Sequence, residues 1–250
     1  PASSLLPSGG IAVSAALALE VGAVAPLAPQ QWAPVPESPM AVPTDPALNP
    51  ASSFYSWHLV DSDGINVMGA WADYTGNGVK VAVLDDGFAH NLSDLSPNYR
   101  TDLDYDTLGN DNDALNGPAD THGTYVSTFI AADDNDSGLV GVAFDSDLVG
   151  IRRGFGAETS IQDTLEGFQH TRTVGADVMN NSWGSTAAFG DHFGINFMGT
   201  DYGEVGTEMI NLVNLGRGGL GTSIVFSAGN SRADGDNVNY KNFQNSPYVI

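Results

Sequence analysis

The sequence has 250 residues and no cysteine, and it contains only 8 lysines and arginines against 30 aspartates and glutamates. Without cysteine, neither disulfide bonds nor thiolate zinc sites can stabilise the fold. The formal net charge of −22 would repel nucleic acid and favours bound cations. We therefore expect no nucleic-acid partner. If the protein works outside the cell, calcium is the natural replacement for disulfide bonds.

The first 42 residues differ in composition from the rest of the chain. They are rich in Ala, Pro, Val and Ser, and Glu20 and Glu37 are their only charged side chains. Glu20 interrupts their apolar stretch, and the first basic residue is Lys80, so the positive flank of a signal peptide is missing. We interpret residues 1–42 as a linker or leader remnant, expect no membrane span, and place one globular domain at 43–250.

Short apolar runs alternate with helical patterns along this domain. The runs lie at 79–84, 146–152, 176–184 and 222–230, and helices are expected at 122–132, 160–175 and 203–218. This alternation predicts an α/β fold with a parallel sheet flanked by helices on both faces. The acidic segment 102–120 is expected to be a loop. Catalytic groups gather at the carboxyl ends of parallel strands, where Asp85, Ser182 and Asn230 lie.

Two of these segments carry residues suited to acyl transfer. Such a hydrolase needs a carboxylate that orients an imidazole, the imidazole as general base, a nucleophile, and donors for the oxyanion. Asp85 ends a buried run and His122 opens a helix 37 residues later (122 − 85), which is one known chain order for this chemistry. Taken singly, an Asp-Gly turn and a histidine at a helix start are also ordinary structural features.

Four motifs occur together in one order: VAVLDDG, HGTYVS, NNSWG and SAGN. In this order and spacing they resemble the subtilisin-like serine proteases, and residues 43–250 are most similar to the kexin and furin branch. The resemblance implies an incomplete three-layer subtilisin-like fold and the N-terminal part of a catalytic domain. It also implies a serine endopeptidase that acts on polypeptides and is secreted or located at the cell surface.

The resemblance implies a role for each matching residue. Asp85 would orient His122, the general base, and the side-chain amide of Asn230 would stabilise the oxyanion. Asp86 would form an acidic wall for the second substrate residue. The segment that pairs with the substrate backbone would comprise Ser182, Trp183 and Gly184.

The nucleophile of the family lies in a Gly-Thr-Ser-x-Ala-x-Pro segment after the oxyanion asparagine, and no such segment follows Asn230 here. We expect it beyond residue 250, in the C-terminal remainder of the catalytic domain. Gly221-Thr222-Ser223 has the same first three residues, but the bulky run that follows predicts a strand. The closing NSPYVI is expected to begin another strand.

The resemblance also implies bound calcium. The side chains of Asp45, Asp94 and Asn135 would bind it together with the carbonyl groups of Asp133, Ser137 and Leu139.

The sequence departs from the kexin and furin branch in the pocket for the substrate residue before the cleaved bond. Ala187 and Lys241 stand where that branch has acids, so we expect no strict preference for basic residues. A second calcium site would contain Asp236, left without its acidic partner. The alternative to a protease is a non-catalytic scaffold or a calcium-stabilised binding or adhesion module, which would not need Asp85, His122 and Asn230 together.

Overall fold

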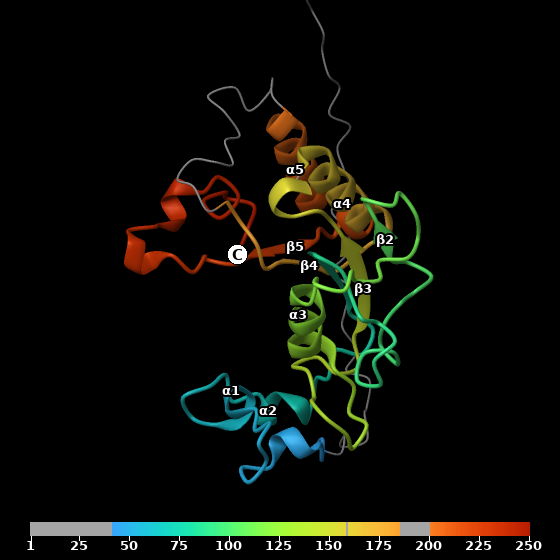
Figure 1. Cartoon of the computed structure of the whole chain (residues 1–250), viewed down its shortest axis with the longest axis vertical. Coiled ribbons are helices and arrows are strands. Elements are labelled where there is room, and N and C mark those ends of the chain that lie inside the picture. Colours follow the sequence, from blue (N-terminus) through green and yellow to red (C-terminus); the bar gives the residue numbers. More distant parts are fainter. Residues whose placement is uncertain (1–41, 159, 186–200) are drawn as a thin grey trace, which may run out of the picture. The chain divides into compact units, whose positions relative to one another are not determined.

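A computed structural model of the chain describes residues 42–158, 160–185 and 201–250. Its centre is a five-stranded sheet in the order β2-β3-β1-β4-β5, in which all neighbours are parallel (Figure 1). The prediction of a parallel sheet is confirmed. The strands are β1 (Lys80–Asp85), β2 (Tyr105–Asp106), β3 (Asp147–Arg152), β4 (Val178–Asn181) and β5 (Ser223–Phe226).

The short strand β2 lies inside the acidic segment that was predicted to be entirely a loop, and that prediction was wrong at this point. Its two residues pair with Ile151 and Arg152 of β3. A strand of two residues shows no alternating pattern, so the sequence carries no signal for it. The guanidinium of Arg152 fixes this edge, because it donates a hydrogen bond of 2.9 Å to Oδ2 of Asp106.

Three longer helices follow the predicted pattern closely, and the shorter helices lie in the connections. Ser160 caps α4, since its Oγ accepts a hydrogen bond of 3.1 Å from the backbone N–H of Gln162. The backbone of α5 leaves helical geometry at Gly216. The α-helices are α1 (Trp57–Val60), α2 (Met68–Trp71), α3 (His122–Ala131), α4 (Ile161–Thr173) and α5 (Asp201–Gly219); the 3₁₀ helices are η1 (Pro46–Leu48), η2 (Gly156–Glu158), η3 (Arg232–Asp234) and η4 (Val238–Tyr240).

The sheet is the middle of three layers (Figure 1), and β1 is its central strand. Successive side chains of a strand point to opposite faces, and all of those from Val81 to Leu84 are buried. Val81 and Val83 pack in the same cluster as Ala131 of α3. Ala82 and Leu84 pack on the other face, against buried side chains of α4 and α5. A strand buried on both faces explains why β1 is a continuous apolar run.

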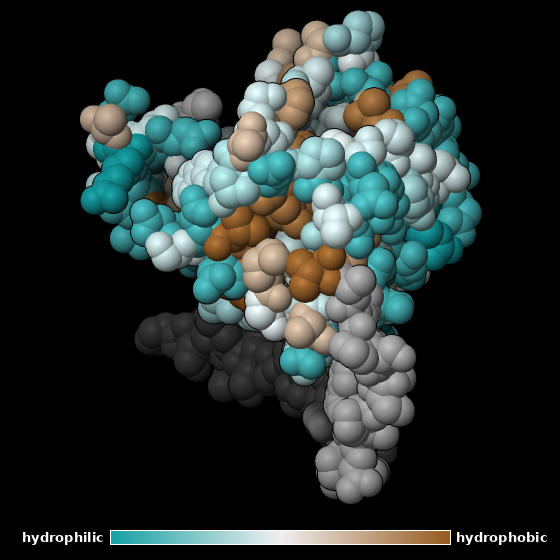
Figure 2. Space-filling model, turned by 90° about the horizontal axis from the view of Figure 1, so that it is seen from below, coloured by the Kyte–Doolittle hydropathy of each residue, from teal (hydrophilic) through white to brown (hydrophobic). Residues whose placement is uncertain are grey.

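A smaller apolar cluster supports the helices that precede the sheet. It contains Leu59 of α1, Trp71 of α2, Val140 and Phe144, and the indole N–H of Trp71 donates a hydrogen bond of 2.9 Å to the carbonyl of Val142. The face drawn in Figure 2 shows an apolar area surrounded by hydrophilic residues. No helix in the described ranges combines the length and apolar character needed to cross a membrane.

The outer edge of β5 is paired by the closing residues of the chain. Val249 forms a parallel bridge with Ile224, and the N–H of Ile250 donates to the carbonyl of Ile224 at 2.9 Å. The expectation that NSPYVI begins a strand is met only by this isolated bridge, because residues 245–250 form no strand in the structure. Ser223 is the first residue of β5 and pairs with Val178, so the prediction that it begins a strand is confirmed.

The interpretation of residues 1–42 as a linker or leader remnant stays a prediction, since 1–41 lie outside the described residues.

Replacing Phe168 by alanine should destabilise the protein strongly. Phe168 lies on α4, is fully buried, and packs against Phe226 and Phe243. Removing such a side chain from a core costs about 3–5 kcal/mol of unfolding free energy. The control is Phe54→Ala, where the side chain is 69% exposed and the expected change is within about 0.5 kcal/mol. Denaturant unfolding of the intact protein measures both, and equal losses would contradict the packing described above.

Candidate active site

Asp85 and His122 meet where β1 ends and α3 begins. Nδ1 of His122 lies 2.8 Å from Oδ1 of Asp85, as the sequence led us to expect. The aspartate is 1% exposed, whereas the imidazole side chain is 57% exposed. Burial raises the pKa of Asp85, and the hydrogen bond from His122 opposes that rise. This arrangement fixes the imidazole by Nδ1 and leaves Nε2 for a reactant.

The close approach of α3 to β1 requires a glycine after the histidine. A Cβ atom on Gly123 would lie 2.6 Å from the carbonyl oxygen of Gly87 and 2.9 Å from Cβ of Asp85. Both contacts are shorter than any real Cβ contact, so a larger residue would push the helix away from the strand. The His-Gly pair thus places the imidazole against the carboxylate.

Asp86 anchors the first turn of α3. Its Oδ2 accepts a hydrogen bond of 3.1 Å from the backbone N–H of His122, and its Oδ1 accepts one of 2.6 Å from Gly123. A carboxylate at a helix N-terminus satisfies free N–H groups and interacts favourably with the helix dipole. The sequence predicted only a substrate-facing role for Asp86. The structure places it in the pocket and also makes it a positioning residue for His122.

These residues border a pocket of about 380 Å³. Asn230 lies in its lining, is exposed, and makes no hydrogen bond to another described residue, so its amide is available to a bound group. The structure thus brings the predicted catalytic and substrate-binding residues together. Those in the lining are Asp85, Asp86, His122, Ser182, Trp183, Gly184, Asn230, Asp236 and Lys241.

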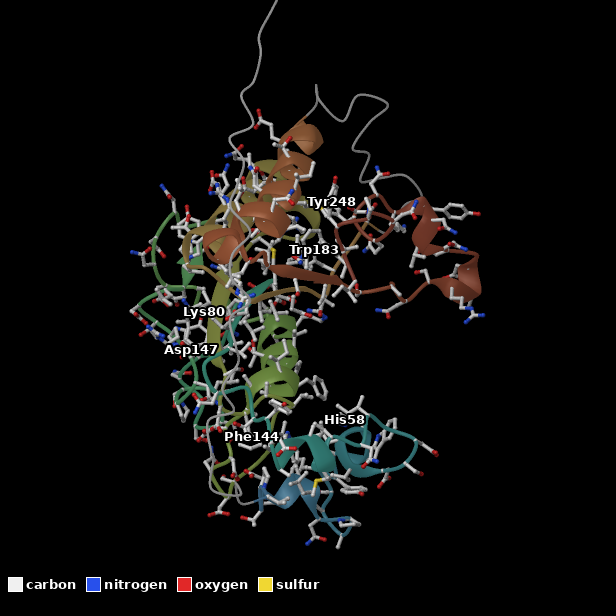
Figure 3. All side chains as sticks on the ribbon, turned by 180° about the vertical axis from the view of Figure 1, so that it is seen from behind. His58, Lys80, Phe144, Asp147, Trp183 and Tyr248 are labelled. Carbon is white, nitrogen blue, oxygen red and sulfur yellow. The ribbon has the colours of Figure 1, made fainter. Side chains whose placement is uncertain are left out.

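The pocket also contains residues that the sequence reasoning missed. Phe155 lines it, and the guanidinium of Arg153 lies 4.8 Å from the Phe155 ring centre and 4.2 Å from the ring of Trp183. The indole N–H of Trp183 donates to the carbonyl of Leu84 at 2.9 Å; Figure 3 labels this side chain, which belongs to the segment that follows β4. Arg153 and Phe155 follow the carboxyl end of β3, so the strand-end rule could have found them. Asp120, Ser227 and Gln244 are further lining residues.

Lys241 and Asp236 form an ion pair in the lining. Lys241 is 4% exposed, and its Nζ lies 3.3 Å from Oδ1 of Asp236. Asp236 thus has a cationic partner in the position where the sequence analysis noted the loss of an acidic one. A second calcium ion would have to displace this ammonium, so these residues do not fit a metal site. Ala187, the other departure noted in the sequence, lies outside the described residues.

The predicted calcium-binding residues converge on the loop after α3. Oδ1 of Asp45 accepts from the N–H of Ser137 at 3.2 Å, and Oδ2 of Asp94 accepts from the N–H of Leu139 at 3.0 Å. The N–H of Asp133 donates to the carbonyl of Asp94 at 2.7 Å. Asp45 and Asp94, which lie outside the loop, thus both contact it through hydrogen bonds from its backbone.

Two side-chain oxygen atoms of the predicted calcium-binding residues lack a partner in the described part of the chain. Oδ2 of Asp45 and Oδ1 of Asn135 are buried and have no hydrogen-bond donor in the described part of the chain. Burial, together with the neighbouring Asp134 carboxyl, raises the pKa of Asp45 to about 7. Oxygen atoms from carboxylates, an amide and the backbone are the ligands that calcium prefers. The residues therefore fit a calcium ion.

No nucleophile completes the pair of Asp85 and His122 within the described ranges. No hydroxyl group there is hydrogen-bonded to Nε2 of His122, whose side chain bonds only to Asp85. Ser223 is absent from the pocket lining. Its position at the start of β5 agrees with the interpretation that its Gly-Thr-Ser is not the nucleophile motif.

Comparisons with known proteins point to one family. The subtilase family, Peptidase_S8, matches residues 76–249. The chain is 35% identical over 205 residues to proprotein convertase subtilisin/kexin type 7 of Mus musculus, and these cover 78% of this chain and 26% of that protein. It is 31% identical over 231 residues to furin of Homo sapiens, covering 83% of this chain and 26% of furin.

Solved structures show the same fold. A serine protease of Aeromonas sobria superposes with a TM-score of 0.63 at 24% identity, over 78% of this chain and 35% of that one. A protease from Pseudoalteromonas arctica gives a TM-score of 0.55 at 24% identity, over 77% of this chain and 60% of that one. The sequence spans about a quarter of the length of the curated relatives that it matches.

Replacing Asp86 by alanine should loosen the start of α3. The substitution removes the acceptor of two backbone N–H groups, which costs about 1 kcal/mol of unfolding free energy. Hydrogen exchange at the amides of His122 and Gly123 should accelerate as well. The matched control is Asp73→Ala, an exposed aspartate whose side chain makes no hydrogen bond to another described residue. If both variants unfold at the same denaturant concentration as the parent protein, Asp86 does not anchor the helix.

Proposed function

This chain belongs to the subtilase family, and we propose that residues 43–250 are the N-terminal part of the catalytic domain of a calcium-dependent serine endopeptidase. The observation that carries the proposal is the 2.8 Å contact between Nδ1 of His122 and Oδ1 of Asp85. It lies in a pocket that also presents the amide of Asn230. A binding module would have no use for a buried carboxylate that orients an exposed imidazole.

Each group has a defined part in peptide-bond hydrolysis. Asp85 holds the imidazole by Nδ1 and stabilises the imidazolium that forms. Nε2 of His122 takes the proton from a serine hydroxyl as that oxygen attacks the scissile carbonyl, and it then gives the proton to the leaving amine. The side-chain N–H of Asn230 donates to the oxyanion of the tetrahedral intermediate. The serine is supplied from outside the described residues, in the C-terminal remainder of the domain.

The polypeptide substrate would bind along the segment after β4. Ser182, Trp183 and Gly184 have no regular secondary structure and line the pocket, so their backbone can accept an extended peptide as an added strand. The guanidinium of Arg153 packs on the ring of Trp183, and the indole N–H of Trp183 donates to the carbonyl of Leu84. Asp86 would face the second substrate residue. We place the enzyme outside the cell or at its surface, with no nucleic-acid partner.

A fluorophosphonate probe tests the catalytic proposal directly, because it reacts with a serine only when a base activates it. We expect the intact protein to be labelled on one serine, and His122→Ala and Asp85→Asn to lose the label while remaining folded. Asn230→Ala should lower kcat for a peptide substrate by roughly 10²–10³-fold, with Asn239→Ala as the surface control. A folded intact protein that neither labels nor cleaves peptides would instead support the binding module.

Chelation of calcium should lower the stability of the protein. A ligand that binds only the folded state at 100 times its Kd stabilises it by about 2.7 kcal/mol. EGTA should therefore lower the Tm, and added Ca²⁺ should restore it. Asp45→Asn should abolish this response, whereas the control Asp73→Asn should keep it. A Tm that is unaffected by EGTA in the parent protein would disprove calcium binding at this loop.

The pocket charge leads to a prediction about specificity. The Lys241 ammonium neutralises Asp236 and would repel a basic side chain of the substrate. We expect peptides that differ only at the residue before the cleaved bond to show no preference for Arg in kcat/KM. Lys241→Gln, which frees Asp236, should raise the relative rate for Arg, and Lys241→Asp should raise it further. A strong Arg preference in the parent protein would refute this role of Lys241.

A further inference from the structure

Arg152, the last residue of β3, lies beside the catalytic pair of Asp85 and His122. It is paired in register with Asp85 of β1, and its side chain is 20% exposed. It is not among the described residues that line the pocket, so it has no direct contact with a peptide bound there. A role for Arg152 in catalysis rests on the proposed function, since it concerns how the catalytic pair is held together.

The guanidinium of Arg152 contacts three segments of the chain at once. Its Nε donates to the carbonyl of Asp86 at 3.2 Å. Nη1 donates to Oδ2 of Asp106 at 2.9 Å, and Nη2 donates to Oδ2 of Asp120 at 3.3 Å. The planar guanidinium presents its donors in fixed directions, whereas a lysine ammonium is a point charge on a flexible stem. Arginine therefore holds the three acceptors in one arrangement.

Two of these acceptors are close to the catalytic pair in the chain. Asp86 directly follows Asp85, and Asp120 lies two residues before His122. Both acceptors also line the pocket. The segment before α3 is held further by Asn116, whose Nδ2 donates to the carbonyl of Asp120 at 2.7 Å. A single side chain thus connects the segment that carries the carboxylate with the segment that carries the imidazole.

The third contact holds Arg152 itself in place. Strand β2 lies on the edge of β3 opposite to β1, and it supplies Asp106, which is 5% exposed. Thr107, the residue after β2, donates to the carbonyl of Arg152 from its N–H at 3.0 Å and from its Oγ1 at 2.9 Å. Both the backbone and the side chain of Arg152 are therefore fixed from one side of β3, while the guanidinium contacts the catalytic pair's segments on the other.

Glycines allow these segments to come close to the arginine. Gly87 has a φ of +127°, and a Cβ atom on it would lie 2.7 Å from Cα of Asn116 and 3.2 Å from Cδ of Arg152. A Cβ atom on Gly117 would lie 2.6 Å from Oδ2 of Asp120, the atom that accepts from Arg152. Larger residues at either position would push the segments away from the guanidinium.

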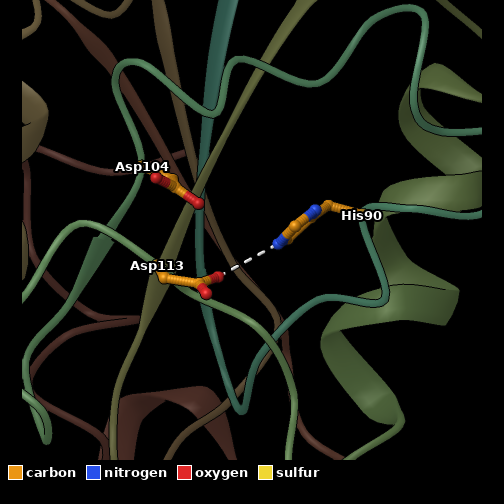
Figure 4. Close-up of side chains that lie close together, drawn as sticks. All are labelled: His90, Asp104 and Asp113. Atoms are coloured by element: carbon orange, nitrogen blue, oxygen red, sulfur yellow. Dashed lines mark hydrogen bonds and ion pairs between the residues drawn. The ribbon is translucent and has the colours of Figure 1, made fainter.

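A second contact joins the same two segments at a greater distance along the chain. Nε2 of His90 lies 3.1 Å from Oδ1 of Asp113 (Figure 4). His90 comes five residues after Asp85, and Asp113 comes nine residues before His122. Neither is among the described residues that line the pocket. This contact can stabilise the junction of the segments, whereas Arg152 contacts them within two residues of the catalytic pair.

We propose that Arg152 is a positioning residue for peptide-bond hydrolysis, which keeps Nδ1 of His122 against the carboxylate of Asp85 by contacting Asp86 and Asp120. A displacement of about 1 Å in catalytic groups can lower a rate by about 10²-fold. The peptide itself would bind along the segment after β4, which Arg152 does not contact. Loss of the guanidinium should therefore lower kcat and leave KM nearly unchanged.

Kinetics of Arg152 variants in the intact protein test this role. Arg152→Ala should lower kcat for a peptide substrate by roughly 10–100-fold. Arg152→Lys keeps the charge but not the planar set of donors, so it should regain only part of the rate. Guanidinium ion at a non-denaturing concentration should restore part of the kcat of Arg152→Ala, and ammonium ion should not.

Nuclear magnetic resonance of the protein labelled with ¹⁵N-histidine gives a readout that is independent of activity. The proton on Nδ1 of His122 is shared with a carboxylate in the parent protein, which shifts its resonance downfield and slows its exchange with water. In Arg152→Ala this proton should exchange faster and its resonance should move upfield, while the dispersed amide spectrum shows that the variant is folded.

Two variants serve as controls. Arg100 also forms ion pairs with two aspartates, Asp102 and Asp147, outside the described lining of the pocket, so Arg100→Ala should leave kcat and the His122 resonance unchanged. His90→Ala removes the other contact between the two segments and should lower the Tm while keeping kcat.

The role of Arg152 would be refuted if Arg152→Ala changes kcat and the His122 resonance no more than His90→Ala does. If Arg152→Ala does not fold, Arg152→Lys decides, and a lysine variant with the kcat of the parent protein would overturn the proposal. A parent protein that a fluorophosphonate does not label contradicts the proposed function, and the role of Arg152 falls with it. A labelled parent whose Arg152→Ala variant is labelled at the same rate contradicts the role of Arg152 alone.

Discussion

The hydrogen bond between His122 and Asp85 is the contact on which the pocket depends, and it exists because β1 is held in a single register. Asp85 pairs with Arg152 of β3, and the N–H of Arg153 donates to the carbonyl of Asp85 at 2.9 Å. A shift of β1 by one residue would turn every side chain to the opposite face of the sheet. Because Val81 to Leu84 are buried on both faces, the core of the molecule opposes such a shift.

The chain is unusually acidic, and several of its charged side chains form ion pairs near the ends of the strands. Near the sheet, buried or half-buried carboxylates are neutralised in different ways. Arg152 bridges Asp106 and Asp120, whereas Lys241 neutralises Asp236. Among the described residues, no donor or cation reaches one carboxylate oxygen of Asp45 and one of Asp104. With so few basic residues, a chain of this composition must expose its acids, bury them in protonated form or bind cations from solution.

Much of the fold and of the candidate site could be predicted from the sequence, and each feature that was not predicted has a physical cause. The long apolar runs and amphipathic segments specify β1, β3, β4, β5 and the three longer helices. The strand-end rule and the family resemblance together led to Asp85, His122 and Asn230. The features that the sequence did not predict depend on contacts between segments that lie far apart in the chain.

Two such contacts are the ion pair of Lys241 with Asp236 and the stacking of Arg153 on Trp183. Neither produces a periodic pattern in the sequence. The anchoring of α3 by Asp86 was missed for another reason. The carboxylate that satisfies the first N–H groups of this helix comes from 36 residues earlier in the chain, and capping rules read only the residues next to a helix start.

The central position of β1 also has a consequence for the order in which the fold can assemble. Strand β1 is made first, but its partners β3 and β4 begin at residues 147 and 178. Asp147 follows its partner Lys80 by 67 residues (147 − 80), which take roughly 3–13 s to be added at a synthesis rate of about 5–20 residues per second. During that interval an apolar strand with two unpaired edges has no native neighbour. The strand that carries Asp85 is therefore also open to wrong association while the protein is being made.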